Sequence, residues 1–381
     1  MATIMDFVVS SVTPKGGNRF EITAQTYNDL IYDGAPPHMQ PCGDITATLI
    51  NTGDVDGKRE SYVGVYENKI LYRKSLDQLV YSDDYGATWT TMGLTPDYGS
   101  GFRLETLNYH ETSGYWFMLL RDGNTDNAIY RSSDNGLNWV AMTMPASTTY
   151  SSGPNIIIDY LGRLLFTSRT NTGEMWLWRW DNPTTDLSIT TSYNWATATH
   201  NTQNLKELPG FGYAIARYTG TGNLAVLIPY DMLSVSNFAG FPTQPGYPWS
   251  FAFNGVVYSW MQVDSGNPRF VSVFNGMTDT PLYLTHDFVD YAQAHRVQAA
   301  GDNYLLMFSQ PNNEPSVWRL IHSFDAVSWS NERNLLLPSD PTSDSGLGGF
   351  NLYKAGGNYW IAHYQDAIGL KLIRFSYNTS C

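Results

Sequence analysis

Apolar and polar positions alternate along most of the chain in short runs separated by polar or glycine-containing turns. Alternation over about four to eight residues is typical of strands with one buried face. Six segments share the order strand, short turn, apolar strand: "ESYVGVYENKILYR", "ETLNYHETSGYWFMLL", "PNIIIDYLGRLLFTS", "WSFAFNGVVYSWMQV", "HRVQAAGDNYLLMFS" and "GFNLYKAGGNYWIAHY". The pattern therefore predicts an all-β chain built from a series of hairpins.

Two turns repeat the pattern S-x-D-x-G-x-[TN]-W, each between two strand-like runs. Short Ser and Asp side chains can bond backbone N–H groups within a turn, and glycine supplies a positive φ. The tryptophan is expected to fold back over the hairpin. We therefore predict two structural staples, formed by Ser82, Asp84, Gly86, Thr88 and Trp89 and by Ser132, Asp134, Gly136, Asn138 and Trp139.

The spacing of the two turns predicts a repeated unit of about four strands. Asp84 and Asp134 are 50 residues apart, and four-stranded repeats have periods of roughly 40–50 residues. Two degenerate copies of the pattern lack the glycine. They are "YLTHDFVDY", with Thr285, Asp287 and Tyr291, and "IHSFDAVSW", with Ser323, Asp325 and Trp329.

The repeated turn resembles the Asp box of sialidases and other bacterial neuraminidase repeat proteins, where it joins the two outer strands of a β-propeller blade. The resemblance implies an all-β fold, a β-propeller with Asp-box hairpins. Strand-like runs divide the chain into seven blades, with six as the alternative. The seven are bounded near 55–95, 100–146, 152–200, 204–243, 247–292, 294–339 and 345–381.

Residues 1–43 do not follow the repeat and predict a small β-hairpin, with strands at 6–12 and 19–26 and a proline-rich exit. Residues 44–381 are assigned to the propeller. Its last repeat has only about three strand-like runs, which would leave an unpaired sheet edge. The run "DITATLINTG", residues 44–53, is the expected closing strand.

The stretch "NRFEITAQTYNDLIYDG" resembles the end of the tail-tip modules of long-tailed bacteriophage host-specificity proteins. The matching positions are Arg19, Glu21, Ile22, Thr23, Ala24, Tyr27 and Asn28. The resemblance implies a virion component that attaches to phage tail proteins in several copies on a symmetric assembly. Its propeller would recognise a host-surface glycan or protein receptor. An ordinary strand is the alternative interpretation of this short stretch.

Charge, apolar runs and the N-terminal sequence limit the classes of partner and the locations that are expected. The net charge of −13 disfavours nucleic acid, since a grip on phosphates needs clustered Lys and Arg. The sequence contains no run of about eighteen apolar residues, so membrane insertion is not expected. The N-terminus lacks a signal-peptide pattern, so secretion is not expected. The phage resemblance implies synthesis in the host cytoplasm and a place in the virion tail. Cys42 and Cys381 are the two cysteines, and no cofactor or metal is expected.

Catalytic motifs are sparse. A sialidase would carry an [FY]-R-I-P motif before the first box, but the nearest string, residues 102–105 ("FRLE"), lacks the proline and follows the first box. Another glycosidase would need two carboxylates brought together from different blades. Glu105, Asp159 and Glu174 are candidates, although surface positions are the simpler interpretation. We expect binding without turnover; a glycoside hydrolase and a bacterial scaffold or assembly factor are the alternatives.

Three tryptophans alternate in "GEMWLWRWDNP". Trp176, Trp178 and Trp180 therefore share one face of a strand, and Arg179 lies on the other. Such a face is typical of the core between blades. If Trp176 or Trp178 lay at a rim, it would instead offer a flat apolar plate to a sugar ring or a protein.

The connection "FAGFPTQPGYPW", residues 238–249, is long and rich in aromatic residues, proline and glycine. Ordered loops of this length carry binding more often than short connections do. We expect it to be the contact loop, with an ordinary linker as the alternative. Its expected contact residues are Phe241, Tyr247 and Trp249.

Overall fold

The computed structural model describes residues 7–14, 20–26, 46–51, 63–75, 78–93, 102–122, 126–144, 148–149, 155–170, 174–197, 201–208, 212–218, 223–237, 249–253, 256–261, 270–274, 279–283, 291–299, 305–311, 317–323, 333–336, 350–356, 359–365 and 370–376. The chain divides into two compact units, one of Met1–Thr46 with Phe375–Cys381 and one of Ala47–Arg374. Among the described residues, no helix has the length and apolar character needed to cross a membrane.

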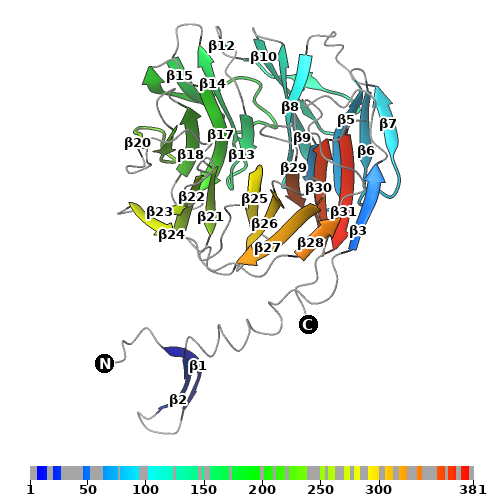
Figure 1. Cartoon of the computed structure of the whole chain (residues 1–381). Coiled ribbons are helices and arrows are strands. Elements are labelled where there is room, and N and C mark those ends of the chain that lie inside the picture. The colour runs from blue at the N-terminus through cyan, green and yellow to red at the C-terminus, as the bar shows by residue number, and fades with distance from the viewer. Residues whose placement is uncertain are drawn as a thin grey trace. The chain divides into compact units, whose positions relative to one another are not determined.

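The first unit contains the N-terminal hairpin that the sequence predicts. Strand β1 (Phe7–Pro14) pairs antiparallel with β2 (Phe20–Thr26), from Phe7 opposite Thr26 to Pro14 opposite Phe20 (Figure 1). The register shifts between Val9 and Ser11. A hairpin of two strands buries little surface, so it is marginal in isolation.

The second unit is built from small antiparallel sheets. Its described strands form seven sheets of four or five strands. Sheet 1 holds β4 (Val63–Tyr66), β5 (Lys69–Ser75), β6 (Gln78–Ser82) and β7 (Thr90–Gly93), and sheet 2 holds β8 (Phe102–His110), β9 (Tyr115–Asp122), β10 (Asp126–Ser132) and β11 (Val140–Ala141). Sheet 3 holds β12 (Thr148–Thr149), β13 (Asn155–Ile158), β14 (Leu164–Thr170), β15 (Glu174–Trp180) and β16 (Thr191–Thr197).

The remaining four sheets continue the same order. Sheet 4 holds β17 (Asn201–Leu208), β18 (Gly212–Tyr218), β19 (Asn223–Ile228) and β20 (Ser236–Asn237), and sheet 5 holds β21 (Trp249–Phe253), β22 (Val256–Met261), β23 (Phe270–Phe274) and β24 (Asp279–Tyr283). Sheet 6 holds β25 (Tyr291–Ala299), β26 (Leu305–Pro311), β27 (Val317–Ser323) and β28 (Arg333–Leu336). Sheet 7 holds β29 (Phe350–Lys354), β30 (Tyr359–Gln365), β31 (Leu370–Ser376) and, at its outer edge, β3 (Thr46–Asn51).

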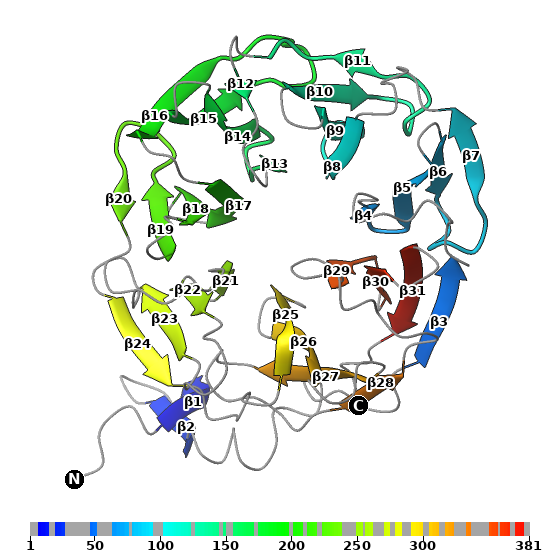
Figure 2. The ribbon, with the colours of Figure 1, turned by 45° about the horizontal axis from the view of Figure 1, so that its top comes forward.

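The sheets of this unit are arranged in a ring with their first strands innermost (Figure 2). Contacts between β4, β8, β13, β17, β21, β25 and β29 link each sheet to the next, and β29 returns to β4. The ring is closed by β3, which lies beside β31 although it precedes sheet 1 in the chain. The expectation that residues 44–53 supply the closing strand is confirmed.

The core lies between neighbouring sheets, because each strand points alternate side chains to its two neighbours. Apolar clusters fill the interfaces between sheets 7 and 1, 1 and 2, 2 and 3, and 3 and 4. In β9, for example, Trp116 and Met118 face sheet 1, whereas Phe117 and Leu119 face sheet 3. A strand buried on both faces explains the long apolar runs in the sequence.

Antiparallel pairing places two kinds of turn at one end of the ring, which we call the turn end. They are the turns after each first strand, such as 159–163, and those after each third strand, such as 83–89, 133–139 and 229–235. The degenerate copy at 321–329 falls after the third strand β27, the equivalent place. The copy at 283–291 falls between β24 and β25, so its assignment as an equivalent turn is wrong.

Candidate functional site

The first staple is held by its own serine and aspartate. Ser82 Oγ accepts the Gly86 N–H at 2.8 Å and donates to Asp84 Oδ1 at 2.7 Å. Asp84 accepts the Thr88 N–H at 2.9 Å through Oδ1 and the Thr88 hydroxyl at 2.6 Å through Oδ2. These bonds from Thr88 lower the pKa of Asp84 to about 2. Gly86 has a φ of +81°, the left-handed region that favours glycine.

The second staple repeats these bonds with Asn138 in place of the threonine. Ser132 Oγ accepts the Gly136 N–H at 2.9 Å, and Asp134 accepts the Asn138 N–H at 2.8 Å and its Nδ2 at 2.6 Å. Gly136 has a φ of +92°. The residue before each glycine, Tyr85 or Asn135, also has a positive φ. Both staples join the third and fourth strands of their sheets.

The tryptophans of the two staples differ in their hydrogen bonds. Trp89 Nε1 donates to the backbone oxygen of Ile50, in the closing strand β3, at 3.1 Å. Trp139 Nε1 donates at 2.9 Å to the oxygen of Gly136, within its own turn. The tryptophan bond of the first staple therefore reaches the strand that closes the ring, whereas that of the second stays within its own turn.

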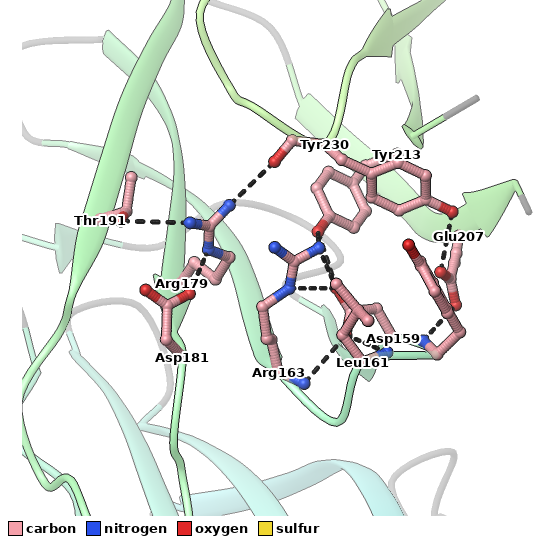
Figure 3. Close-up of polar contacts among 10 residues, drawn as sticks. Asp159, Leu161, Arg163, Arg179, Asp181, Thr191, Glu207, Tyr213 and Tyr230 are labelled. Carbon is pink, nitrogen blue, oxygen red and sulfur yellow. Dashed lines mark hydrogen bonds and ion pairs between the residues drawn. The ribbon is translucent and has the colours of Figure 1, made fainter. Parts of the chain in front are cut away.

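A polar network connects sheets 3 and 4 at the turn end (Figure 3). The buried carboxylate of Asp159 forms an ion pair with Arg163 at 2.7 Å and accepts the Tyr213 hydroxyl at 2.8 Å. Arg163 Nη2 donates to the same hydroxyl at 2.7 Å. Burial and the neighbouring Asp159 raise the pKa of Tyr213 above its usual range, so this phenol stays protonated and donates.

A second carboxylate extends the network from sheet 4. Glu207 Oε2 accepts the Tyr160 N–H at 3.0 Å, and Oε1 accepts the Tyr230 hydroxyl at 2.9 Å (Figure 3). Burial raises the pKa of Glu207 above its ordinary value. Across the same interface, Arg179 pairs with Asp181 at 2.6 Å and donates to the backbone oxygen of Tyr230 at 2.9 Å. The prediction that Arg179 faces away from the neighbouring tryptophans is confirmed.

The network serves to hold backbone and side chains in place. Asp159 Oδ1 accepts the N–H groups of Leu161 and Arg163, while Oδ2 accepts Arg163 Nε and the Tyr213 hydroxyl. Each oxygen thus has two donors, which satisfies most of the carboxylate's capacity. The expectation of a surface position for Asp159 is wrong. Because its donors fix it in the interface, this carboxylate is suited to positioning the turn.

Sequence reasoning missed Arg163, Glu207, Tyr213 and Tyr230. The run "DYLGR" contained a local signal, since an Asp followed by a glycine turn suggests side-chain bonds to the backbone. Tyr213 and Glu207 lie some 50 residues away in the chain. Their contacts depend on how two sheets lie side by side, which a single sequence does not specify.

Above the network the turns carry exposed apolar side chains. Tyr160 is 65 % exposed and Leu161 55 %; Leu233, on the turn after the third strand of sheet 4, is 79 % exposed. The rings of Tyr160 and Tyr230 meet edge to face with centroids 5.3 Å apart, which joins the two turns. The turn end therefore presents apolar groups on a hydrogen-bonded base.

The tryptophans of β15 lie in the core between sheets 2 and 3. Trp180 is buried, Trp178 is 5 % exposed and stacks on Phe166, and Trp176 is half-buried against the same cluster. Trp178 therefore does not provide the exposed plate that a binding role requires. Trp176 donates to Glu174 Oε2 at 3.3 Å and stacks on Trp178.

The other candidate residues are dispersed or lie outside the described residues. Phe241 and Tyr247 are outside them, and Trp249 begins β21. Glu105 is at a register shift in β8 between Leu104 and Thr106. Glu174 begins β15, at the opposite end of sheet 3 from Asp159, so Glu174 and Asp159 do not form a pair. The described side chains include no group of acids, histidines or cysteines arranged to hold a metal.

No protein-family model matches the chain. No curated protein matches it either. Solved structures resemble it in fold: YCF48 bound to D1 peptide has a TM-score of 0.56 at 12 % identity, covering 88 % of this chain and 96 % of that one. YCF48 from Cyanidioschyzon merolae has a TM-score of 0.51 at 12 % identity, covering 87 % and 98 %.

A third structure, prolyl oligopeptidase B from Galerina marginata bound to a 35mer substrate, has a TM-score of 0.54 at 8 % identity, covering 82 % of this chain and 48 % of that one. All three are β-propeller folds. The chain is a β-propeller. At these identities the likeness defines the fold alone, because one propeller architecture supports many unrelated functions.

Proposed function

We propose that the chain is a bacteriophage tail component whose Asp-box propeller recognises a host surface without catalysing a reaction. The observation that supports this proposal most is the use made of charged groups at the turn end. Asp159, Arg163 and Tyr213 bond one another and the backbone of a turn whose tip, Leu161, faces solvent. These charged groups are satisfied by one another and by the turn backbone, which supports a binding role over a catalytic one.

The Asp-box part of the proposal rests on the staples. Both copies have the same serine and aspartate bonds and a glycine at positive φ, at the same place in their sheets. In this proposal the staples hold blades together and the ligand binds elsewhere. The contact loop remains residues 238–249, joining the outer strand β20 to the inner strand β21.

Attachment to host cells tests the recognition part of the proposal. Replacing Phe241, Tyr247 and Trp249 with alanine in the full chain should reduce adsorption to host cells, because a few aromatic anchors carry most interface energy. The melting temperature should stay unchanged, and the exposed Leu137→Ala serves as the matched control. A glycan array run beside a turnover assay identifies the receptor class.

The result that would overturn the proposal is release of free sugar from host polysaccharide by the purified chain. Loss of that activity on replacing a single Glu or Asp would establish a glycoside hydrolase. Wild-type adsorption by the triple variant would remove the contact loop from the proposal.

The N-terminal hairpin is proposed to attach the propeller to the tail. Deleting residues 1–43 should leave a folded propeller, since β3 (Thr46–Asn51) is kept, and should abolish incorporation into phage particles. Deleting residues 1–53 should also expose the edge of β31 and give aggregated protein. Circular dichroism, light scattering and a count of the protein in purified virions measure these outcomes. Normal incorporation of the shorter deletion would contradict the attachment role.

A further inference from the structure

Two turns of neighbouring blades form a small apolar surface, the tyrosine–leucine patch, made of Tyr160, Leu161, Tyr230 and Leu233. The first turn follows β13 and the second follows β19. Tyr160 and Tyr230 meet edge to face between them. Leu161 and Leu233, each more than half exposed, project apolar groups that no described neighbour covers.

The patch is held in a defined shape by its base. Asp159 Oδ1 accepts the Leu161 N–H at 3.0 Å, and Asp231 Oδ1 accepts the Leu233 N–H at 3.0 Å. Gly162 and Met232 have positive φ angles of 76° and 58°, a conformation that is costly for a residue with a side chain such as Met232. Turns held in one shape lose less entropy on binding, so the exposed leucines on them favour association.

The charge beneath the patch is negative. Asp159 is balanced by Arg163, and Asp181 by Arg179. Two further acids, Glu207 and Asp231, each serve as hydrogen-bond acceptors. Glu207 Oε2 accepts the Tyr160 N–H and Oε1 accepts the Tyr230 hydroxyl, and a carboxylate oxygen has capacity for a second donor. A partner that brings a cation to Glu207 would therefore gain an attraction strengthened by partial burial.

We propose that the tyrosine–leucine patch docks an extended basic segment of another protein. Aliphatic side chains of the segment cover Leu161 and Leu233, and a lysine or arginine reaches Glu207. Charge complementarity favours this occupant over an acidic one. The two exposed leucines favour a peptide, whose aliphatic side chains can cover them, over a sugar, whose ring stacks on aromatic side chains.

This docking site is separate from the proposed host-surface contact. By the direction of the strands, β20 ends and β21 begins at the end of the ring opposite the patch. One end would thus bind a protein of the same assembly while the other faces a receptor. The inference rests on the turns alone, and its failure would leave the host-adsorption test unaffected.

Binding of labelled peptides to the full chain tests the proposal. The probes are three 12-residue peptides of equal length in which leucine alternates with arginine, glutamate or serine, followed by fluorescence anisotropy. The leucine–arginine peptide should bind best. The double change Leu161→Ala and Leu233→Ala should weaken its binding by at least about tenfold, because both apolar contacts are lost. Leu137 is 54 % exposed on the second staple, and Leu137→Ala should bind as the wild type does.

The role of charge is tested by Glu207→Gln, which keeps the shape and removes the negative charge. Binding of the leucine–arginine peptide should fall several-fold and its salt dependence should become shallower. Asp231→Asn provides a second charge variant if Glu207→Gln is unstable. Equal binding by wild type and the leucine double variant would overturn the proposal, as would preference for the glutamate peptide. Wild-type binding of neutral oligosaccharide, lost in the leucine variant, would assign the patch to a glycan instead.

Discussion

The two stapled turns have the same internal bonds, but they support different parts of the ring. The second staple completes its own hairpin, since Trp139 bonds Gly136 and Gly136 lies against Leu71 of the preceding blade. The first staple lies against Ile50, and Trp89 bonds the backbone of that residue. In both, the glycine meets the preceding blade. Only in the first is the contacted strand the one that closes the ring.

The difference shows that one local pattern acquires a second role from its position in the ring. Among the described blades, the first is the one whose preceding neighbour is completed by a strand from the other end of the chain. The staple itself needs no change in its serine, aspartate or glycine for this purpose. Three pairs of matched variants can break or sharpen the comparison.

The largest effect is expected for the tryptophans. Trp89→Ala removes an indole ring that meets the Tyr72 ring edge to face, with centroids 5.1 Å apart, and its hydrogen bond to the oxygen of Ile50. The change should lower the free energy of unfolding by about 3–5 kcal/mol. Trp139→Ala should lower the free energy of unfolding by less. Chemical denaturation measures the stability, and amide exchange at residues 46–51 should rise for Trp89→Ala alone. Equal exchange in both variants would show that the first staple does not hold β3.

Alanine at the staple glycines should give the next largest difference. A Cβ on Gly86 would lie 2.6 Å from Ile50 Cδ1, whereas on Gly136 the nearest atom is 3.3 Å away. Left-handed backbone costs alanine about 1 kcal/mol at either site. Gly86→Ala should therefore lose about 2–3 kcal/mol and Gly136→Ala about 1 kcal/mol. Ile50→Val should partly rescue Gly86→Ala; no rescue would place the strain elsewhere.

The smallest effect is expected for the loss of stability when the pH is lowered. The pKa of Asp84, about 2 in the folded chain, is lowered by bonds from Thr88, so its stabilisation is present above pH ~4 and is lost as the pH falls toward 2. The carboxylate is near solvent, which limits the effect to below about 1 kcal/mol. Asp84→Asn should flatten stability between pH 4 and 2, as measured by thermal unfolding. An unchanged pH profile would contradict this account.

The second staple provides the control for acid sensitivity. At Asp134 burial raises the pKa, but bonds from Asn138 and Ser132 outweigh burial and leave the pKa lowered. The opposing contributions should make the stability lost on acidification smaller than at Asp84. A larger effect of Asp134→Asn than of Asp84→Asn would reverse this order.

Much of the fold follows from the sequence because it depends on local patterns. Alternation and turn residues located the hairpins, and the incomplete last repeat indicated that residues 44–53 close the ring. The degenerate copy at 283–291 was wrongly expected to be an equivalent turn, because an acid and an aromatic residue recur by chance in a Tyr-rich chain. Trp178 lies in the core between blades, as the alternating pattern of tryptophans indicated.

The candidate site was mostly hidden from sequence reasoning. Asp159 was noticed as a carboxylate, but its partners Arg163 and Tyr213 were not, since Tyr213 reaches it from the next blade. The exposed leucines were missed because an apolar residue in a turn has no pattern of its own. Their significance depends on burial and on neighbours, which the folded chain provides.

Ring closure by β3 also governs the order of events during synthesis. The ribosome makes β3 before the strands of sheets 1 to 6 and its partner β31 after all the other described strands, so their pairing is among the most non-local contacts in the chain. Contacts of such sequence separation form slowly, because loop closure must precede them. Until β31 emerges, β3 is a nascent edge strand able to pair with other chains, and the time before closure is when we expect aggregation to compete with folding.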